Sequence, residues 1–225
     1  MERKGLLLVI SGPSGAGKTT VCNELLVRVE GLRPSISWTT RKPRPGEVNG
    51  REYFFTDPAT FQEMVRGDEF AEWAAVYGHF YGTPKKPLSE MVEQGVDMLL
   101  EIDVQGAMQI KKKFPDAVTV YLLAPSIAEL RARLVRRASD TPEEISRRLR
   151  QARDEIRHYH DYDYIVRNED LKEAVKAAEH ILQAERLKTT RVNVAKIEER
   201  MTRECATIMA VEAEEPAGST QKRGV

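Results

Sequence analysis

Gly12-Pro13-Ser14-Gly15-Ala16-Gly17-Lys18-Thr19 matches the pattern G-x-x-x-x-G-K-[ST] at every fixed position. In this pattern the glycines let successive backbone N–H groups converge on phosphate oxygens, and the helix that follows directs its positive dipole end to the same place. The lysine reaches the outer phosphates, and the hydroxyl of Thr19 can bind Mg²⁺. We therefore predict a nucleotide phosphate site rather than a structural glycine turn.

The flanks of this loop supply the structural context that phosphate binding requires. Leu6 to Ser11 is a short apolar run, typical of a strand buried on both faces in a parallel sheet. A helix is predicted after Lys18, because apolar residues recur at i, i+3, i+4 and i+7 before Gly31, which is placed to end it. These apolar residues are Cys22, Leu25, Leu26 and Val29.

Further strands and helices alternate along the chain. Apolar runs at 98–102, 118–123 and 164–166 are predicted strands, and residues 171–182 repeat the helical spacing. Strands that alternate with helices favour an α/β fold with a parallel sheet.

Two stretches interrupt the alternation. Residues 37–87 are rich in Gly, Pro, Thr, Arg and aromatic residues and contain turn signals, which predicts an inserted lobe containing β-strands. Residues 131–150 hold seven arginines against three acids, and residues 141–144 resemble a helix start. An arginine-rich helix is most often a solvated surface, so composition alone does not assign this one a function.

Composition and charge exclude several classes of protein. The 225 residues carry 35 Lys and Arg against 35 Asp and Glu, so no global field draws the molecule to nucleic acid or an anionic membrane. Two distant cysteines, Cys22 and Cys205, indicate neither a disulfide framework nor a zinc site, and we expect a cytoplasmic protein. No run approaches the length of a membrane span, and the N-terminal apolar run does not fit a signal peptide.

The C-terminal part has the weakest pattern. Periodicity is expected to end near Thr202, and residues 212–225 have no core-forming pattern, which predicts a disordered tail.

The inserted stretch carries three informative segments: SWTTRKPRPGEVNGREYFF (37–55), FAEWA (70–74) and GHFYGT (78–83). Two arginines three apart, with hydroxyl and phenol groups, suit a second phosphate. Together with the phosphate loop, these segments resemble guanylate kinases over about residues 4–190.

The resemblance implies a P-loop three-layer α/β core with a parallel sheet, an inserted mixed-β lobe for GMP, and a helical lid. The implied bounds are core 4–36, 93–128 and 158–190, GMP-binding lobe 37–92, lid 129–157, and a C-terminal extension 191–225.

The resemblance also implies the GMP site. Residues matching the family positions that hold the GMP phosphate or read guanine are Arg41, Arg44, Tyr53 and Tyr81 for the phosphate, and Ser37, Glu72, Thr83 and Asp103 for the base. The chemistry agrees, because a carboxylate such as Glu72 can accept from both N1–H and the amine of guanine, whereas adenine offers an acceptor at N1. Glu101 and Asp103 lie two apart at a strand end, so both side chains point the same way; the role of Glu101 stays open.

On the ATP side, the resemblance implies that Mg²⁺ binds through Thr19, water and phosphate. The expected ATP-binding residues are Gly12, Pro13, Ser14, Gly15, Ala16, Gly17, Lys18, Thr19, Thr20 and Asn168. The expected catalytic residues are Lys18, Arg133, Arg137 and Arg148. The chain departs from the family pattern at Arg136, Ala138 and Arg167.

The implied reaction transfers the γ-phosphoryl group of ATP to GMP, and to dGMP, giving ADP and the diphosphate for the supply of guanine nucleotides. The attacking phosphate oxygen is already anionic, so alignment and charge stabilisation replace a strong base. One rival is a non-catalytic guanylate-kinase-like module that binds phosphopeptides, which intact Lys18 and Thr19 disfavour. Another is a kinase for a different nucleoside monophosphate, which Glu72 with Thr83 argues against. ATP and GMP are the expected partners, without nucleic acid or membrane, and oligomeric state stays open.

Overall fold

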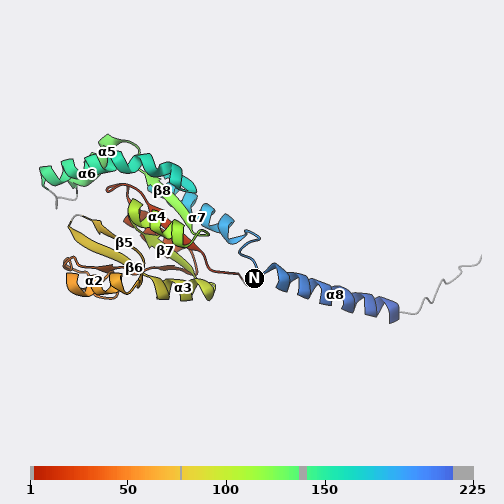
Figure 1. Ribbon diagram of the computed structural model, residues 1–225. Helices are drawn as coiled ribbons and strands as arrows, with labels where there is room; N and C mark the ends of the chain where they lie inside the picture. Colours follow the sequence, from red (N-terminus) through yellow and green to blue (C-terminus); the bar gives the residue numbers. More distant parts are fainter. Residues whose placement is uncertain (1–2, 77, 137–140, 215–225) are drawn as a thin grey trace, which may run out of the picture.

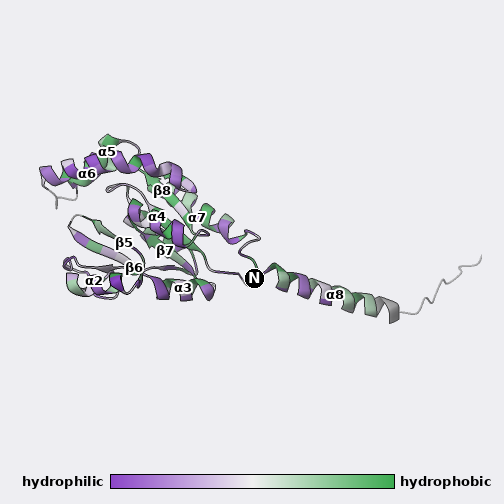
Figure 2. Ribbon diagram, in the orientation of Figure 1, coloured by the Kyte–Doolittle hydropathy of each residue, from purple (hydrophilic) through white to green (hydrophobic). Residues whose placement is uncertain are grey.

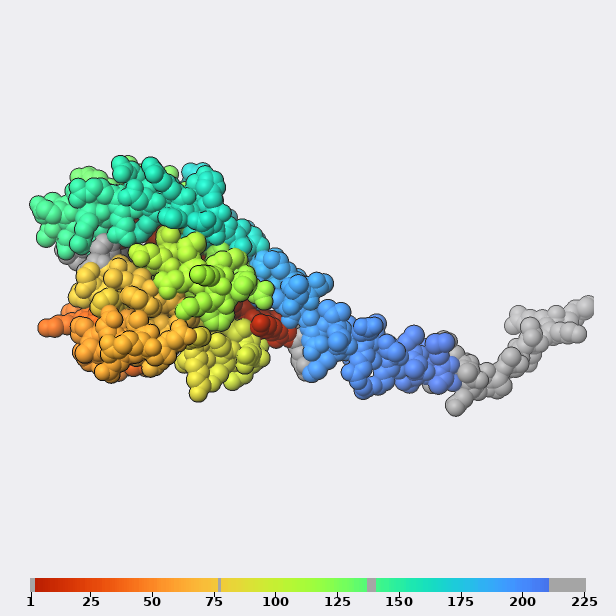
Figure 3. All heavy atoms as spheres, in the orientation of Figure 1, coloured from red at the N-terminus to blue at the C-terminus, as the bar shows by residue number. Residues whose placement is uncertain are grey.

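The computed structural model describes residues 3–76, 78–136 and 141–214. It consists of a central body that carries two smaller lobes, with one long helix extending from it (Figure 1). In the space-filling view the lobes form separate masses at one end of the body (Figure 3).

The body is built on a parallel sheet of five strands in the order β2-β7-β1-β8-β9. The strands are β1 (Leu7–Ser11), β2 (Leu32–Pro34), β7 (Asp97–Glu101), β8 (Val118–Leu123) and β9 (Tyr164–Arg167). The four predicted strands are confirmed. β2 is not predicted from the sequence; it is a three-residue edge strand in which only Leu32 is buried.

Helices cover both faces of this sheet. One apolar cluster joins β1 to α1 (Lys18–Arg28) and α7 (Leu171–Arg186), and a second joins it to α3 (Lys85–Glu93) and α4 (Val104–Lys113). Alternate residues of β1 enter opposite clusters, which is why the run is apolar throughout. Hydrophobic colour is accordingly concentrated on the central strands (Figure 2). The predicted three-layer α/β core is confirmed.

The first lobe contains a mixed sheet of four strands in the order β4-β3-β6-β5, as predicted. Its elements are β3 (Trp38–Thr39), β4 (Phe54–Phe55), α2 (Pro58–Arg66), β5 (Phe70–Val76) and β6 (His79–Pro84). The rings of Phe61 and Phe70 stack at 4.6 Å, and those of Phe61 and Phe80 at 5.5 Å, so α2 is packed firmly on the sheet.

The second lobe is helical. It consists of α5 (Ile127–Arg136) and α6 (Pro142–Glu155), followed by the 3-10 helix η1 (Ile156–Asp161). Thr141 caps α6 in a capping box with Glu144, as residues 141–144 predicted. Leu130, Leu134 and Ala152 form a small core of their own. Arg137 and Ala138 lie outside the described residues.

The C-terminal extension corrects one expectation. Helix α8 (Val194–Glu214) continues well past Thr202, where periodicity was expected to end. Its second half is rich in Ala and Glu, which favour helix in solvent. Two ion pairs four residues apart, Arg200–Glu204 and Glu199–Arg203, stabilise the turns before it. Neither α8 nor any other helix in the described part of the chain is long and apolar enough to cross a membrane. The remainder of the predicted tail, 215–225, lies outside the described residues.

Candidate functional site

A cavity of about 180 Å³ lies where the phosphate loop, the mixed-β lobe and the helical lobe meet. It is at the carboxyl ends of β1 and β7, the usual place for ligands in an open parallel sheet. The predicted residues that line it come from the phosphate loop, the mixed-β lobe and the end of β7: Gly12, Ser14, Lys18, Ser37, Tyr53, Glu72, Tyr81 and Asp103. The structure therefore brings the base-reading and phosphate-binding predictions into one site.

The backbone of the phosphate loop requires glycine at two positions. Gly17 has φ +96°, and a side chain there would lie 2.4 Å from the amide nitrogen of Asn168. At Gly12, with φ +139°, a Cβ would lie 2.3 Å from the carbonyl oxygen of Leu122. The loop can thus approach its neighbours closely only because these residues lack side chains.

Lys18 lies back over the loop that precedes it. Its Nζ donates to the carbonyl oxygens of Gly12 at 2.6 Å and Pro13 at 3.1 Å. Burial lowers the pKa of Lys18, while the charges of Glu101, Glu155 and Asp103 oppose that effect. A buried ammonium group held only by carbonyl oxygens can exchange them for phosphate oxygens.

Thr19 and Glu101 form the candidate cation site. The Thr19 hydroxyl donates to Oε1 of Glu101 at 2.6 Å, which gives Glu101 a position beside the loop. Oxygen donors of this kind suit Mg²⁺, which binds few protein groups and keeps several waters. No cluster of three or more His, Cys, Asp or Glu able to hold a metal occurs among the described residues.

The base-reading residues form a buried polar cluster. Thr83 donates its hydroxyl to Oε1 of Glu72 at 2.6 Å, and the hydroxyls of Thr83 and Ser37 lie 3.3 Å apart. Glu72 is 3% exposed, and burial raises its pKa to about 7. Asp103 caps α4 through the N–H of Gly106 at 2.8 Å, and burial raises its pKa too. A ligand with two adjacent donors would satisfy carboxylates that are costly to bury alone.

Three of the predicted phosphate-binding residues, Arg41, Tyr53 and Tyr81, lie together in the mixed-β lobe. Arg41 pairs with both oxygens of Glu47, at 2.8 and 2.9 Å, and its guanidinium lies 5.4 Å from the ring centre of Tyr53. Burial raises the pKa of Tyr53 to about 12, so its phenol remains a donor. Arg44 is exposed, and its backbone N–H binds Glu47 at 2.7 Å. Glu47 is not a predicted site residue, although it pairs with the side chain of Arg41 and accepts from the backbone of Arg44.

A second cavity, of about 580 Å³, lies on the other side of the loop between α5 and the start of α7. Arg133 binds the carbonyl oxygens of Ala16 at 3.2 Å and Asn168 at 3.0 Å, and pairs with Glu129 at 2.9 Å. The amide of Asn168 also donates to Ala16, at 2.8 Å. These contacts hold the loop, and Arg136 pairs with the same Glu129 at 3.1 Å. Thr20 lines this cavity as well.

Helix α6 of the helical lobe contributes residues to the first cavity, the one that Lys18 and Glu72 line. Arg148 donates to the hydroxyl of Ser14 at 3.3 Å. Gln151 and Glu155 also line this cavity. The Gln151 amide donates to Glu155 at 2.7 Å, and burial raises the pKa of Glu155. Neither residue is predicted from the sequence, although the spacing of Arg148, Gln151 and Glu155, at i, i+3 and i+7, places all three on one helical face.

Comparison with known proteins agrees with this geometry. The family profile for guanylate kinase matches residues 4–185. A guanylate kinase of Carboxydothermus hydrogenoformans is 50% identical over 190 residues, covering 84% of this chain and 93% of the relative. One of Clostridioides difficile is 49% identical, covering 84% of this chain and 92% of the relative. The crystal structure of guanylate kinase from Anaplasma phagocytophilum aligns with a TM-score of 0.74 and 38% identity, covering 88% of this chain and 95% of that one.

Proposed function

The chain belongs to the guanylate kinase family and is an ATP:GMP phosphotransferase, and we propose that it divides this reaction between the two cavities and the lid. The observation that carries the proposal is the single cavity in which Lys18 of the phosphate loop and the buried Glu72 both lie. We place the reaction in the cytoplasm, in line with the two free cysteines.

GMP, or dGMP, binds between the mixed-β lobe and the core. Glu72 accepts from the two adjacent donors of guanine, and Thr83 with Ser37 orients that carboxylate. Asp103 lies beside it, and Arg41, Arg44, Tyr53 and Tyr81 hold the phosphate of GMP. Adenine would leave the buried carboxylate unpaired, which disfavours AMP by roughly 10⁴-fold.

ATP binds with its phosphates on the loop 12–19 and its base toward Thr20 and Asn168. Mg²⁺, held by Thr19 through its hydroxyl and by the ATP phosphates, would supply charge neutralisation on the transferred group. Glu101 orients the Thr19 hydroxyl, and its carboxylate would accept hydrogen bonds from water bound to the ion.

Transfer requires alignment more than acid–base chemistry, because the attacking phosphate oxygen is already anionic. Lys18 exchanges the carbonyls of Gly12 and Pro13 for phosphate oxygens, and Arg133, Arg137 and Arg148 complete the positive surroundings. Closure of α6 over the cavity excludes water, which suppresses hydrolysis of ATP.

The test is a coupled assay of ADP release with ATP against GMP, dGMP, AMP, UMP and CMP. We expect turnover with GMP and dGMP and little with the other three. Glu72→Ala should sharply reduce efficiency with GMP and narrow the preference over AMP. No turnover with GMP would overturn the activity, whereas an unchanged GMP/AMP ratio in the variant would overturn only the role of Glu72.

A further inference from the structure

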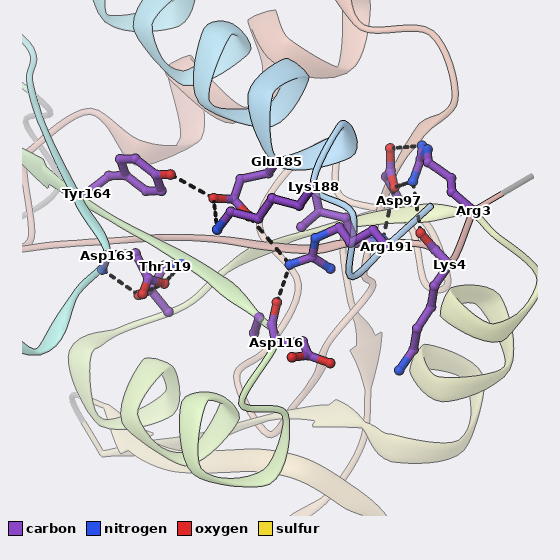
Figure 4. Close-up of polar contacts among 12 residues, drawn as sticks. Arg3, Lys4, Asp97, Asp116, Thr119, Asp163, Tyr164, Glu185, Lys188 and Arg191 are labelled. Carbon is purple, nitrogen blue, oxygen red and sulfur yellow. Dashed lines mark hydrogen bonds and ion pairs between the residues drawn. The ribbon is translucent and has the colours of Figure 1, made fainter. Parts of the chain in front are cut away.

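Helix α8 has a firmly attached base. The preceding segment is bound to the body through Arg191, which donates to the carbonyl oxygen of Asp116 and lies 3.6 Å from the buried carboxylate of Glu185 (Figure 4). Glu185 in turn accepts from the phenol of Tyr164 at 2.7 Å. The carbonyl of Arg191 accepts from the N–H of Lys4 at 3.0 Å. The chain is therefore held at the point where α8 leaves the body, beyond the region 4–185 that the family profile matches.

One face of α8 is an apolar stripe. At 100° per residue, five side chains fall within an arc of about 80° over four turns. They are Val194, Ile197, Met201, Cys205 and Ile208. Val194, Met201 and Ile208 are 47%, 55% and 58% exposed, and the helix stands away from the body (Figure 3). A continuous apolar stripe of this length in solvent indicates an interaction surface.

The spacing of the stripe is symmetric about Met201. Its steps are three, four, four and three residues, so reversing the helix about Met201 places each apolar residue opposite another: Val194 opposite Ile208, Ile197 opposite Cys205, and Met201 opposite itself. A self-complementary surface of this kind is what a two-fold symmetric contact between identical chains requires.

The charges that border the stripe fit the same arrangement. Arg200 and Glu204 lie on one flank, 3.7 Å apart within the helix. In an antiparallel pair centred on Met201, the flank that carries Arg200 and Glu204 in one copy lies beside the same flank of the other copy. At about 1.5 Å per residue, Arg200 of one copy then lies about 3 Å along the helix axis from Glu204 of the other. Both such pairs form at once by symmetry.

A parallel pair fits less well for two reasons. A heptad through Val194, Met201 and Ile208 puts Glu204, not Cys205, at the second core position, so two carboxylates would meet in the seam. The body at the base of α8 is also broader than the helix itself (Figure 1), whereas packed helices lie only about 8–10 Å apart. Parallel helices would force two bodies together at one end, whereas antiparallel helices place them at opposite ends.

We propose that α8 is a self-association element through which two copies of this chain pair antiparallel about Met201. The occupant of the apolar stripe is the same stripe of a second copy.

The first test is sedimentation velocity of the full chain over a range of micromolar concentrations. The wild type should be a dimer, and Met201→Glu, which sets two carboxylates against each other at the centre, should raise the dimer dissociation constant by roughly 100-fold. Ala206→Glu is the matched control, because it adds the same charge to the outward face of α8 and should leave the dimer intact. GMP-dependent turnover should be unchanged in both, which shows that the body is folded.

The second test fixes the orientation. With Cys205→Ser as background, chains carrying Val194→Cys are mixed with chains carrying Ile208→Cys and oxidised with diamide. Antiparallel pairing predicts disulfide-linked dimers in the mixture and none from either variant alone. The proposal is overturned by a wild-type monomer at high micromolar concentration, by a dimer that survives Met201→Glu, or by cross-linking of Val194→Cys alone.

Discussion

The carboxyl groups of Glu72 and Asp103 meet over Gly106. Glu72 comes from β5 of the mixed-β lobe and Asp103 from the end of β7 in the core, yet a Cβ on Gly106 would lie 2.6 Å from Oε2 of Glu72 and 3.3 Å from Oδ1 of Asp103. Glu72 is buried and Asp103 is half-buried, burial raises the pKa of both, and the charge of Asp103 raises the pKa of Glu72 further. Because each negative charge disfavours ionisation of the other carboxyl, a ligand or a proton that compensates one of them favours the ionised form of the other.

The space over Gly106 can be tested directly. Gly106→Ala should push Glu72 out of place and lower kcat/KM for GMP by roughly 10²-fold, because a displacement near 1 Å disrupts alignment. The KM for ATP should stay the same, since the phosphate loop is not touched. Gly67→Ala is the control, because its nearest neighbour is the flexible end of Glu69 at 3.3 Å. If Gly106→Ala impaired the use of ATP as much as the use of GMP, the assignment of Glu72 to the GMP site would be contradicted.

The pKa of Glu72 predicts how stability varies with pH. Its folded-state pKa is raised from 4.5 to about 7, so the neutral form is the one that favours folding. That contribution is fully present below about pH 4.5 and is lost as pH rises through about 7, amounting to about 3 kcal/mol at most. Glu72→Gln, which does not titrate, should lack this loss. Urea unfolding of the wild type and Glu72→Gln at the same series of pH values measures the difference in their free energies of unfolding. If that difference did not change with pH, the prediction would be refuted.

GMP binding should favour the ionised form of Glu72, whereas folding favours the neutral form. Guanine needs the ionised carboxylate as an acceptor, so affinity should fall up to tenfold per pH unit below about 7 as Glu72 takes up a proton. The phosphate of GMP titrates in the same way with the wild type and with Glu72→Gln. The difference between the two proteins therefore reports the titration of the Glu72 side chain alone. Calorimetry in buffers of different ionisation enthalpy should detect proton release on binding to the wild type that is missing in the variant.

Lys18 should act on turnover rather than on GMP binding. Its Nζ is now satisfied by two loop carbonyls, and the proposed role is on the ATP side in the transition state. Lys18→Met should lower kcat by at least about 10²-fold while the Kd for GMP is unchanged. Lys85→Met, at an exposed ion pair with Asp68, is the control. Loss of GMP affinity with turnover intact would contradict this role.

Local patterns predicted most of the fold and the phosphate loop. Residues 6–31 form a strand, loop and helix whose signals are all contained in the segment, so the sequence was sufficient there. β2 could not be predicted because a strand of three residues, of which one is buried, is too short to show an alternating hydrophobic pattern. The sequence patterns do not predict helix α8, and periodicity is expected to end near Thr202, because the apolar stripe of α8 does not pack on a core and its polar faces hide the spacing.

The site was harder to predict where it depends on contacts between distant elements. Glu47 holds Arg41 only because the loop between β3 and β4 folds back, which no spacing reveals. Gln151 and Glu155 share a helical face with Arg148, but α6 is so rich in charge that the sequence does not say which face is covered. Asn168 matched the family position near adenine, and the structure adds that its amide is bonded to Ala16 of the loop.

Asp97 should be the most costly acidic residue to replace outside the site. Its fully buried carboxylate accepts from Arg3 at 2.5 and 2.6 Å, from Arg186 at 2.7 Å and from the N–H of Leu6 at 2.9 Å. Asp97→Asn removes the charge that both guanidinium groups face and should lower the free energy of unfolding by about 3–5 kcal/mol. KM values should not change, since the residue lies at the start of β7, opposite the cavity.

The matched control for Asp97 is Asp68→Asn, which breaks an equally short ion pair, with Lys85 at 2.6 Å, on the surface. Solvent already screens that pair, so the urea midpoint should barely move. Urea unfolding monitored by tryptophan fluorescence compares the two variants under one condition. If both midpoints moved by the same amount, burial would not be what gives the Asp97 cluster its strength, and the attachment of the N-terminal segment to the sheet would have to rest on backbone pairing instead.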